Sequence, residues 1–232
     1  MIMIDSATSG HRLPVMLIRT PGVYRPQTDT WLLAAALAEA ALPPGGRVVD
    51  VCSGTGALAL RAGLCGAASV TAIDISRAAS VSTWLNCRLR GVDVEVLRGD
   101  FETAVADREF DVLLANPPYV PARCDRRVRG RARAWHAGSD GRAFLDRLCA
   151  RTPDLLARDG TALIVHSVVA DPDLTMTQLR RGGLKAAVVA RTTVPFGPVM
   201  RRCAAHLVEQ GLIQPGQQDE ELVVIRADKT RK

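Results

Sequence analysis

Four consecutive residues, Asn116-Pro117-Pro118-Tyr119, carry the sharpest chemical signal in this 232-residue chain. The Asn116 side-chain oxygen and the Pro117 carbonyl are two acceptors, enough to hold both protons of a planar NH2 group and turn its lone pair toward an electrophile. Two prolines stiffen the loop, and Tyr119 offers a flat face to a planar group. We predict that Asn116, Pro117 and Tyr119 are catalytic and that all four residues bind substrate. The alternative is a strand that ends in a rigid Pro-Pro turn.

A second chemical segment is the glycine-rich turn Cys52-Ser53-Gly54-Thr55-Gly56, between a β-branched strand and a helix. Its glycines allow a ligand close to the backbone, and free N–H groups at the helix start can bind it. The spacing also fits a nicotinamide dinucleotide fingerprint, and a turn without a ligand remains open. Asp50, in the strand before the turn, favours a cationic ligand because a carboxylate repels a pyrophosphate.

Two more acids follow the next two predicted strands. Asp74 could accept both hydroxyls of a ribose, and Asp100 could accept from an adenine amino group while Phe101 packs on the ring. Each acid alone could be a cap or loop residue. Together with Asp50 they favour S-adenosyl-L-methionine, whose methionine part carries an ammonium and a sulfonium. The cofactor-binding residues predicted from this pattern are Asp50, Cys52, Gly54, Gly56, Asp74, Ile75, Asp100, Phe101 and Asn116.

Alternating strands and helices must position these residues. The apolar and β-branched runs predict strands at 47–52, 69–75, 92–97, 110–115, 161–169, 185–193 and 220–227, with helices between most of them. Such alternation is typical of an α/β fold with a parallel sheet wound on both faces. Without a repeat or linker, we expect one domain over 1–232, with a lead-in segment over 1–28 and an arginine-rich loop on the substrate side over 120–141. Trp31 and Trp84 fall on helices and are expected in the core.

The net charge of +6 is concentrated in one segment. Residues 123–133 hold six arginines and one acid, which is 6 − 1 = +5, so the rest of the chain is near neutral. This segment could bind RNA or DNA phosphates or an acidic protein surface, or be a solvated lid. Six scattered cysteines without zinc spacing predict reduced thiols and no metal site. No secretory signal and no membrane-spanning run is present, so we expect a cytoplasmic protein without a membrane partner.

These motifs resemble the class I S-adenosylmethionine methyltransferases, specifically the HemK-like glutamine methyltransferases of translation release factors. The resemblance runs from about residue 23 to the end and is strongest over 23–145. Asn-Pro-Pro-Tyr is shared with adenine- and cytosine-amino methyltransferases, whereas Val23-Tyr24-Arg25-Pro26-Gln27-Thr28-Asp29-Thr30 and Trp135-His136-Ala137-Gly138-Ser139-Asp140-Gly141 are more specific. The resemblance implies that Asp29 and Thr30 contact the methionine end of the cofactor. It also implies a Rossmann-like, mostly parallel seven-stranded sheet with helices on both faces and an antiparallel C-terminal strand.

The chain departs from the family in three places. It has no room for the helical domain that precedes the catalytic domain of bacterial-type members. It is closer to a compact branch of archaea and eukaryotes. For that branch, the resemblance implies a small zinc-binding activator subunit as a partner to consider. Cys52 stands where glycine is commoner, and the arginines at 123–133 are not part of the family pattern.

The resemblance implies methylation of a glutamine amide nitrogen, in the Gly-Gly-Gln loop of a release factor. A nucleic-acid methyltransferase acting on an adenine amino group remains open, with the 123–133 arginines on the backbone. The lack of a separate recognition domain counts against this alternative. A non-catalytic cofactor-binding scaffold is a third hypothesis, disfavoured by the intact Asn116-Pro117-Pro118-Tyr119 segment.

Overall fold

Eight strands form one sheet in the part of the chain that the computed structural model describes, residues 2–3, 16–40, 43–121, 137–138 and 140–230. They are β1 (Ile2–Met3), β2 (Arg47–Val51), β3 (Ser69–Asp74), β4 (Glu95–Arg98), β5 (Phe110–Ala115), β6 (Leu156–Ser167), β7 (Lys185–Pro195) and β8 (Asp219–Asp228). Their order is β1-β7-β8-β6-β5-β2-β3-β4. β8 is antiparallel to β6 and β7, and the other neighbours are parallel. The predicted seven-stranded sheet with an antiparallel C-terminal strand is confirmed, and β1 extends it by a two-residue edge strand.

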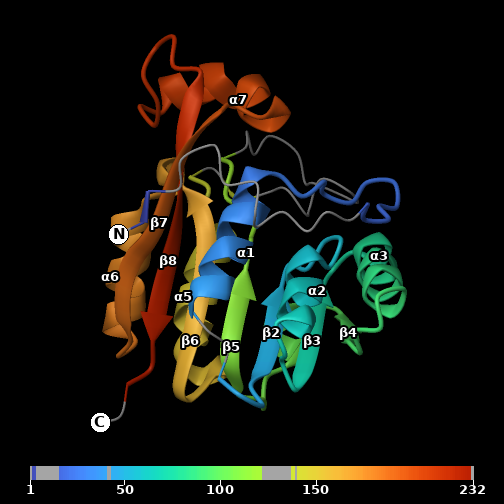
Figure 1. The fold of residues 1–232 in the computed structure, drawn as a ribbon. Coiled ribbons are helices and arrows are strands. Elements are labelled where there is room, and N and C mark those ends of the chain that lie inside the picture. Colours follow the sequence, from blue (N-terminus) through green and yellow to red (C-terminus); the bar gives the residue numbers. More distant parts are fainter. Residues whose placement is uncertain (1, 4–15, 41–42, 122–136, 139, 231–232) are drawn as a thin grey trace.

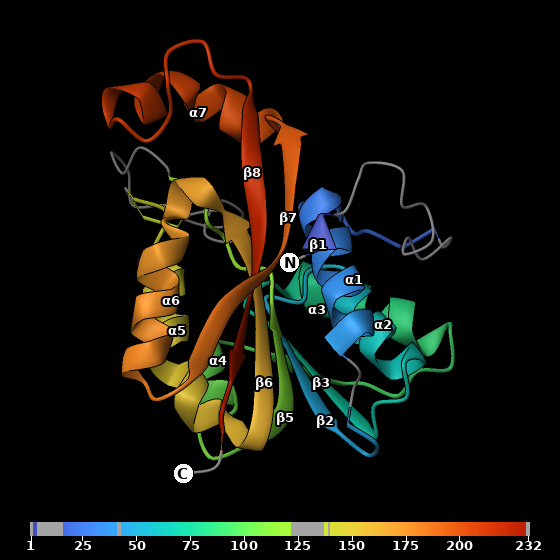
Figure 2. The ribbon, with the colours of Figure 1, turned by 60° about the vertical axis from the view of Figure 1, so that its left-hand side comes forward.

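Helices cover both faces of this sheet. They are α1 (Thr28–Ala40), α2 (Ala57–Leu64), α3 (Arg77–Arg88), α4 (Phe101–Ala104), α5 (Ala143–Leu155), α6 (Pro172–Arg181) and α7 (Pro198–Glu209), with a short 3-10 turn at Val168–Ala170. Figure 1 labels the elements, and Figure 2 shows α1, α2 and α3 on one side of the sheet with α4, α5 and α6 on the other. α7 lies beyond the sheet, where β7 and β8 extend past their neighbours.

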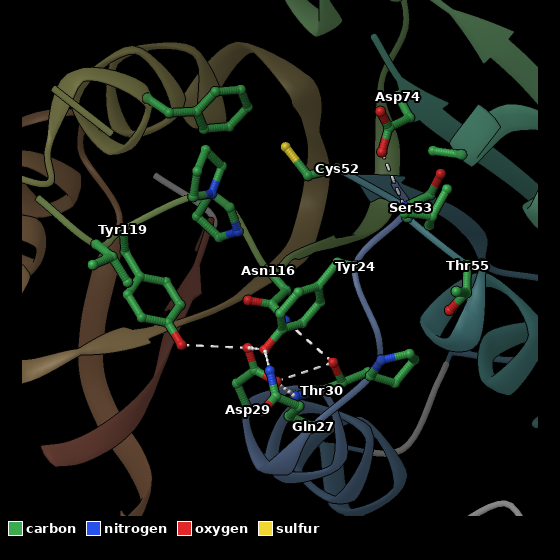
Figure 3. A pocket seen from close by; sticks show the side chains of 18 of the residues that line it. Tyr24, Gln27, Asp29, Thr30, Cys52, Ser53, Thr55, Asp74, Asn116 and Tyr119 are labelled. Carbon is green, nitrogen blue, oxygen red and sulfur yellow. Dashed lines mark hydrogen bonds between the residues drawn. The ribbon is translucent and has the colours of Figure 1, made fainter. Parts of the chain in front are cut away.

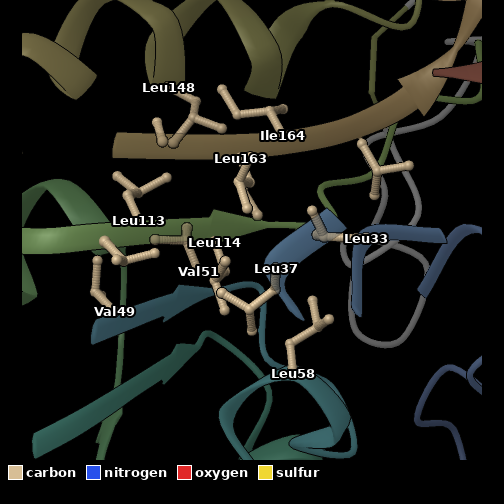
Figure 4. Packing of buried hydrophobic residues seen from close by; sticks show 14 of the residues in the cluster. Leu33, Leu37, Val49, Val51, Leu58, Leu113, Leu114, Leu148, Leu163 and Ile164 are labelled. Atoms are coloured by element: carbon tan, nitrogen blue, oxygen red, sulfur yellow. The ribbon is translucent and has the colours of Figure 1, made fainter. Parts of the chain in front are cut away.

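The buried middle of the sheet explains why β2, β3 and β5 form where the sequence predicts them, within one residue. β6 begins five residues before its predicted start at 161, and β4 begins three residues after its predicted start at 92. β5 is buried at all but one of its positions, since helices cover both its faces. In Figure 4, leucines of α1 pack with branched residues of β2, β5 and β6. Leu33 and Leu113 are fully buried, and a fully buried leucine contributes roughly 1.5–3 kcal/mol over an exposed one. Parallel strands in this core bring their carboxyl ends to one edge, where the loops gather.

Trp84 corrects the sequence analysis. Its side chain is 51% exposed, because α3 buries the opposite, more polar face, which carries Ser82 and Asn86. The core prediction for Trp84 is therefore wrong, whereas Trp31 packs partly buried against the core. The single-turn helix α4 was not predicted either.

Two expectations depend on segments that are only partly described. Most of the predicted arginine-rich loop, including all of 123–133, lies outside the described residues, as does most of the first half of the lead-in segment. The single-domain organisation stays a prediction. No described helix combines the length and apolar character that crossing a membrane requires.

Candidate functional site

The carboxyl ends of β2 and β3 shape the first wall of the site. Cys52, Gly54 and Gly56 all have positive φ, which lets the chain turn tightly after β2. The Gly54 N–H donates to Asp74 Oδ2 over 3.0 Å, and the Ser76 N–H donates to Asp74 Oδ1 over 2.8 Å. A carboxylate has about four acceptor positions, so Asp74 keeps two of them for a ligand.

The turn opens into a cavity of about 560 Å³ (Figure 3). The predicted residues that line it are Asp29, Thr30, Cys52, Gly54, Asp74, Ile75, Asp100, Phe101, Asn116, Pro117, Pro118 and Tyr119. These residues come from five separate segments of the chain. The fold therefore brings together nearly the whole set that the motifs suggested.

Asp50 and Gly56 do not line this cavity. Asp50 is fully buried and accepts the N–H of Ala59 over 3.0 Å, so its carboxylate anchors the start of α2. Burial raises the pKa of Asp50 to about 8. Gly56 lies against α3, where an added Cβ would stand 2.8 Å from the Thr83 Cα. The cofactor contacts predicted for Asp50 and Gly56 stay predictions.

An arginine that the sequence analysis missed pairs with Asp100. Arg147, on α5, donates to both Asp100 oxygens over 2.7 and 2.8 Å, contacts Glu102, and lies 5.5 Å from the centre of the Phe101 ring. Burial raises the pKa of the Asp100 carboxyl, but hydrogen bonds from Arg147 and the Glu102 N–H outweigh it, and the pKa falls below its ordinary value. Asp100 is thus an ionised acceptor beside the Phe101 ring.

The predicted catalytic end of the site centres on Asn116, which follows β5. Its Nδ2 donates to the Thr30 hydroxyl over 3.3 Å, which leaves the amide oxygen as the free end. Figure 3 shows that oxygen turned away from Thr30. Among the described residues nothing donates to it. The predicted acceptor for a substrate NH2 group is therefore present in the cavity wall.

Two tyrosines close this end around Asp29, whose side chain is only 3% exposed. The hydroxyls of Tyr24 and Tyr119 donate to Asp29 Oδ2 over 2.8 and 3.3 Å. Burial, followed by the negative charge of Asp29, raises the pKa of both tyrosine hydroxyls far above their ordinary value. Both therefore stay protonated donors, and neither is a base.

A third wall comes from the C-terminal part of the chain, for which the sequence carried no motif. Residues 194–195 and 197–200, at the end of β7 and the start of α7, contribute mainly apolar side chains. Glu220 of β8 also lines the cavity, and its Oε2 has no hydrogen-bond partner among the described residues. Burial raises the pKa of Glu220. The end of β7, the start of α7 and β8 thus complete the lining of the cavity.

A buried asparagine ties the lead-in segment to the glycine-rich turn. Asn86, on α3, donates to the carbonyls of Ile18 and Thr55 over 2.8 and 2.9 Å and accepts the Ile18 N–H over 2.8 Å. The sequence could have indicated this role only through the position of a polar residue on the buried face of the helix. Arg147 offered no such signal, because exposed arginines on helices are common.

Comparison with known proteins adds independent evidence. The family described as Methyltransferase small domain matches residues 15–129. A protein of Methanocaldococcus jannaschii, provisionally named a protein N5-glutamine methyltransferase, is 30% identical over 78% of this chain and 90% of its own length. A release factor glutamine methyltransferase of Deinococcus radiodurans is 37% identical over 72% of this chain. The match spans only 61% of that longer protein.

Among solved structures, the fold is similar to that of the E. cuniculi Mtq2–Trm112 complex, which is responsible for methylation of the eRF1 translation termination factor. The TM-score is 0.57, with 19% identity over 90% of this chain and 99% of that one. At this identity the match supports the fold alone.

Proposed function

Because the chain belongs to the class I S-adenosylmethionine-dependent methyltransferases, we propose that it methylates the side-chain amide nitrogen of a protein glutamine, in the Gly-Gly-Gln loop of a translation release factor. It is an enzyme that uses S-adenosyl-L-methionine. Two relatives are named as glutamine methyltransferases. What we propose is that a protein glutamine is also the substrate of this chain.

The residues present suit this cofactor. Asp74 retains two acceptor positions for ribose hydroxyls, and Asp100 with Phe101 offers an acceptor and a ring to adenine. When bound, S-adenosyl-L-methionine supplies a methyl group made electrophilic by a positively charged sulfur. The Cys52 to Gly54 backbone and the lead-in segment form the walls between these acids and Asn116.

The observation that carries the proposal is the free oxygen of Asn116 in the cavity wall. An amide nitrogen is a weak nucleophile because its lone pair is delocalised into the carbonyl. Acceptors at Asn116 Oδ1 and the Pro117 carbonyl would hold both N–H protons and turn the nitrogen face toward the methyl group. Rate would then come from alignment and exclusion of water. As the C–N bond formed, the methyl–sulfur bond would break and leave a neutral thioether, and the surplus proton on the nitrogen would pass to water.

A methyl-transfer assay with four acceptors tests the proposal. The purified chain receives labelled cofactor and a release factor, the same factor with its loop glutamine replaced by alanine, RNA, or DNA. Each acceptor is offered with and without a Trm112-type protein, since the structurally similar complex contains one. We expect label on the release factor only, and none on the alanine version.

The variant Asn116→Ala serves as the internal control. We expect it to lose transfer by roughly 100-fold or more, because the oriented acceptor is gone, while cofactor affinity stays within about 3-fold. Label on nucleic acid alone would replace the proposal with the adenine alternative. A dependence on the Trm112-type protein would add an activator subunit to it.

A further inference from the structure

We propose that Glu220 of β8 binds the substrate, by accepting a hydrogen bond from a backbone N–H of the peptide that carries the methyl-accepting glutamine. This inference rests on the proposed function, because it names the part of a protein substrate that this wall of the cavity recognises. It assigns Glu220 to the substrate and not to the cofactor.

The argument begins with an acceptor that the fold leaves unused. Glu220 lines the cavity and is only 7% exposed. The Ser167 hydroxyl donates a hydrogen bond to the carboxyl group, but Oε2 has no hydrogen-bond partner among the described residues. A buried carboxylate oxygen without a donor destabilises the folded protein. An unpaired acceptor in the wall of a cavity therefore indicates a donor that arrives with a ligand.

The charge of Glu220 is also uncompensated. Burial raises the pKa of its carboxyl group, the Ser167 hydroxyl lowers it, and the negative charge of Asp29 raises it again. No arginine or lysine of the described part of the chain contributes to this balance. Two carboxylates at this end of the cavity would repel a phosphate and attract an N–H donor. This electrostatic setting favours a peptide over a nucleic acid.

The strand order places Glu220 on the far side of Asn116 from Asp74. Across the sheet, β3, β2, β5, β6 and β8 are successive neighbours (Figure 1). Asp74 ends β3, and Asn116 follows β5. β6 ends at Ser167, which pairs with Leu222 of β8. A ligand that reaches from Asn116 to Glu220 thus extends away from Asp74, as a substrate would and a cofactor held by Asp74 would not.

The required donor is an N–H other than the reacting NH2 group, whose two protons are taken by Asn116 and Pro117 in the proposed function. An adenine base in a nucleic acid has no other N–H donor, whereas a peptide has one at each residue except proline. Apolar side chains that include Val194 and Met200 line the same wall. A hydrogen bond to an ionised acceptor is stronger where such side chains exclude water.

Glu220→Gln and Glu221→Gln form a matched pair of variants. Both residues belong to β8, and each substitution removes one negative charge. Glu221 does not line the cavity, and its carboxylate accepts a hydrogen bond from Arg191 over 3.2 Å. The probes are a short peptide with the Gly-Gly-Gln sequence and two depsipeptides. In each depsipeptide an ester oxygen replaces one N–H, either that of the glutamine or that of the residue after it.

Under the conditions that give label in the methyl-transfer assay, we expect Glu220→Gln to raise the KM of the peptide by about 10–100-fold. Its kcat and cofactor Kd should change by less than about 3-fold, and Glu221→Gln should behave as the wild type. With the wild type, one of the two depsipeptides should show a similar rise in KM. With Glu220→Gln, the same ester should cause no further rise, because the acceptor for that N–H is already altered.

Two kinetic results would overturn the inference. The first is an equal KM for Glu220→Gln and Glu221→Gln, or an ester effect that is as large in Glu220→Gln as in the wild type. The second is a rise in cofactor Kd that accounts for the whole loss, which would assign Glu220 to the cofactor.

A thermal measurement tests the unused acceptor without any substrate. Glu220→Gln removes a buried charge that lacks a donor and keeps an acceptor for Ser167. We therefore expect its Tm at about pH 8 to rise by about 2–5 °C, whereas the Tm of Glu221→Gln stays within about 1 °C or falls. A Tm of Glu220→Gln that does not rise would show that the fold already satisfies this carboxylate, and would overturn the inference.

The acceptor that takes label separates this inference from the proposed function. Label on nucleic acid alone rejects the proposed function and, with it, a peptide donor for Glu220. Label on the release factor, with an equal KM for Glu220→Gln and Glu221→Gln, rejects this inference alone.

Discussion

The Gly54 N–H donates to Asp74 Oδ2 across 3.0 Å, and this bond joins the loops that follow β2 and β3. The two strands are parallel neighbours, with Asp50 aligned to Ala72, so their carboxyl ends lie side by side. Asp74 thus shapes the glycine-rich turn and also presents its remaining lone pairs to a ligand. Loss of the negative charge should affect both roles.

We expect Asp74→Asn to weaken S-adenosyl-L-methionine binding by about 10–100-fold, the value of one or two charge-assisted hydrogen bonds. Isothermal titration calorimetry measures the change. Asp111→Asn is the matched control, because Asp111 also accepts two or more hydrogen bonds, from Arg47, but lies away from the cavity. An equal effect of the two substitutions would contradict a ligand role for Asp74.

Two glycines with similar backbone angles allow the stability cost of a packing clash to be measured apart from the cost of backbone strain. Gly56 and Gly45 have nearly the same φ, +76° and +74°, but an added Cβ meets Thr83 at Gly56 and nothing within 4 Å at Gly45. We expect Gly56→Ala to lower the free energy of unfolding by roughly 2–4 kcal/mol, and Gly45→Ala by about 1 kcal/mol. Urea denaturation checks both values, and similar losses would show that the contact between α2 and α3 can relax.

Asn86 should stabilise the fold through the lead-in segment. Asn86→Ala leaves the Thr55 carbonyl and the Ile18 backbone without partners, and we expect a loss of about 2–4 kcal/mol of unfolding free energy. Ser80→Ala on the same helix is the control, since that hydroxyl only donates to the carbonyl of Ser76. Trypsin should also cut after Arg19 faster in Asn86→Ala than in the control. Unchanged cleavage would mean that other contacts hold the segment.

Buried His166 predicts a pH dependence of stability. Burial lowers the pKa of His166 to about 4, below the ordinary value of 6.5, so the folded state resists protonation. Between about pH 6.5 and pH 4 the unfolded chain binds a proton that the folded chain does not, and stability falls as the pH falls. This single group contributes a loss of up to about 3 kcal/mol across that window.

His166→Gln removes the titrating ring and keeps a donor for the Ser167 carbonyl. We expect the unfolding free energy of the variant to fall less steeply than that of the wild type between about pH 6.5 and pH 4. Identical slopes would show that His166 is protonated in the folded protein. The comparison uses slopes, so a constant packing cost of the substitution does not affect it.

Local structure and the residues at the strand ends could be predicted from the amino-acid sequence alone. Strands, turns and helices follow from apolar periodicity and from backbone freedom at positions such as Gly54, which depend on neighbours along the chain. Since parallel strands end at one edge, the placement of Asp74, Asp100 and Asn116 around one cavity could also be expected.

What each polar side chain faces depends on how the helices and strands pack together. Asp50 and Asp74 both belong to parallel strands, but one carboxylate turns into the sheet toward α2 and the other toward the cavity. Tyr119 reaches Asp29 from 90 positions away, and Arg147 reaches Asp100 from 47. Such contacts depend on how whole helices and strands pack. The interactions that select them join distant parts of the chain, so they cannot be predicted from a short stretch of sequence. The same packing brings the Asn116 Nδ2 to the Thr30 hydroxyl, 86 positions away in the sequence.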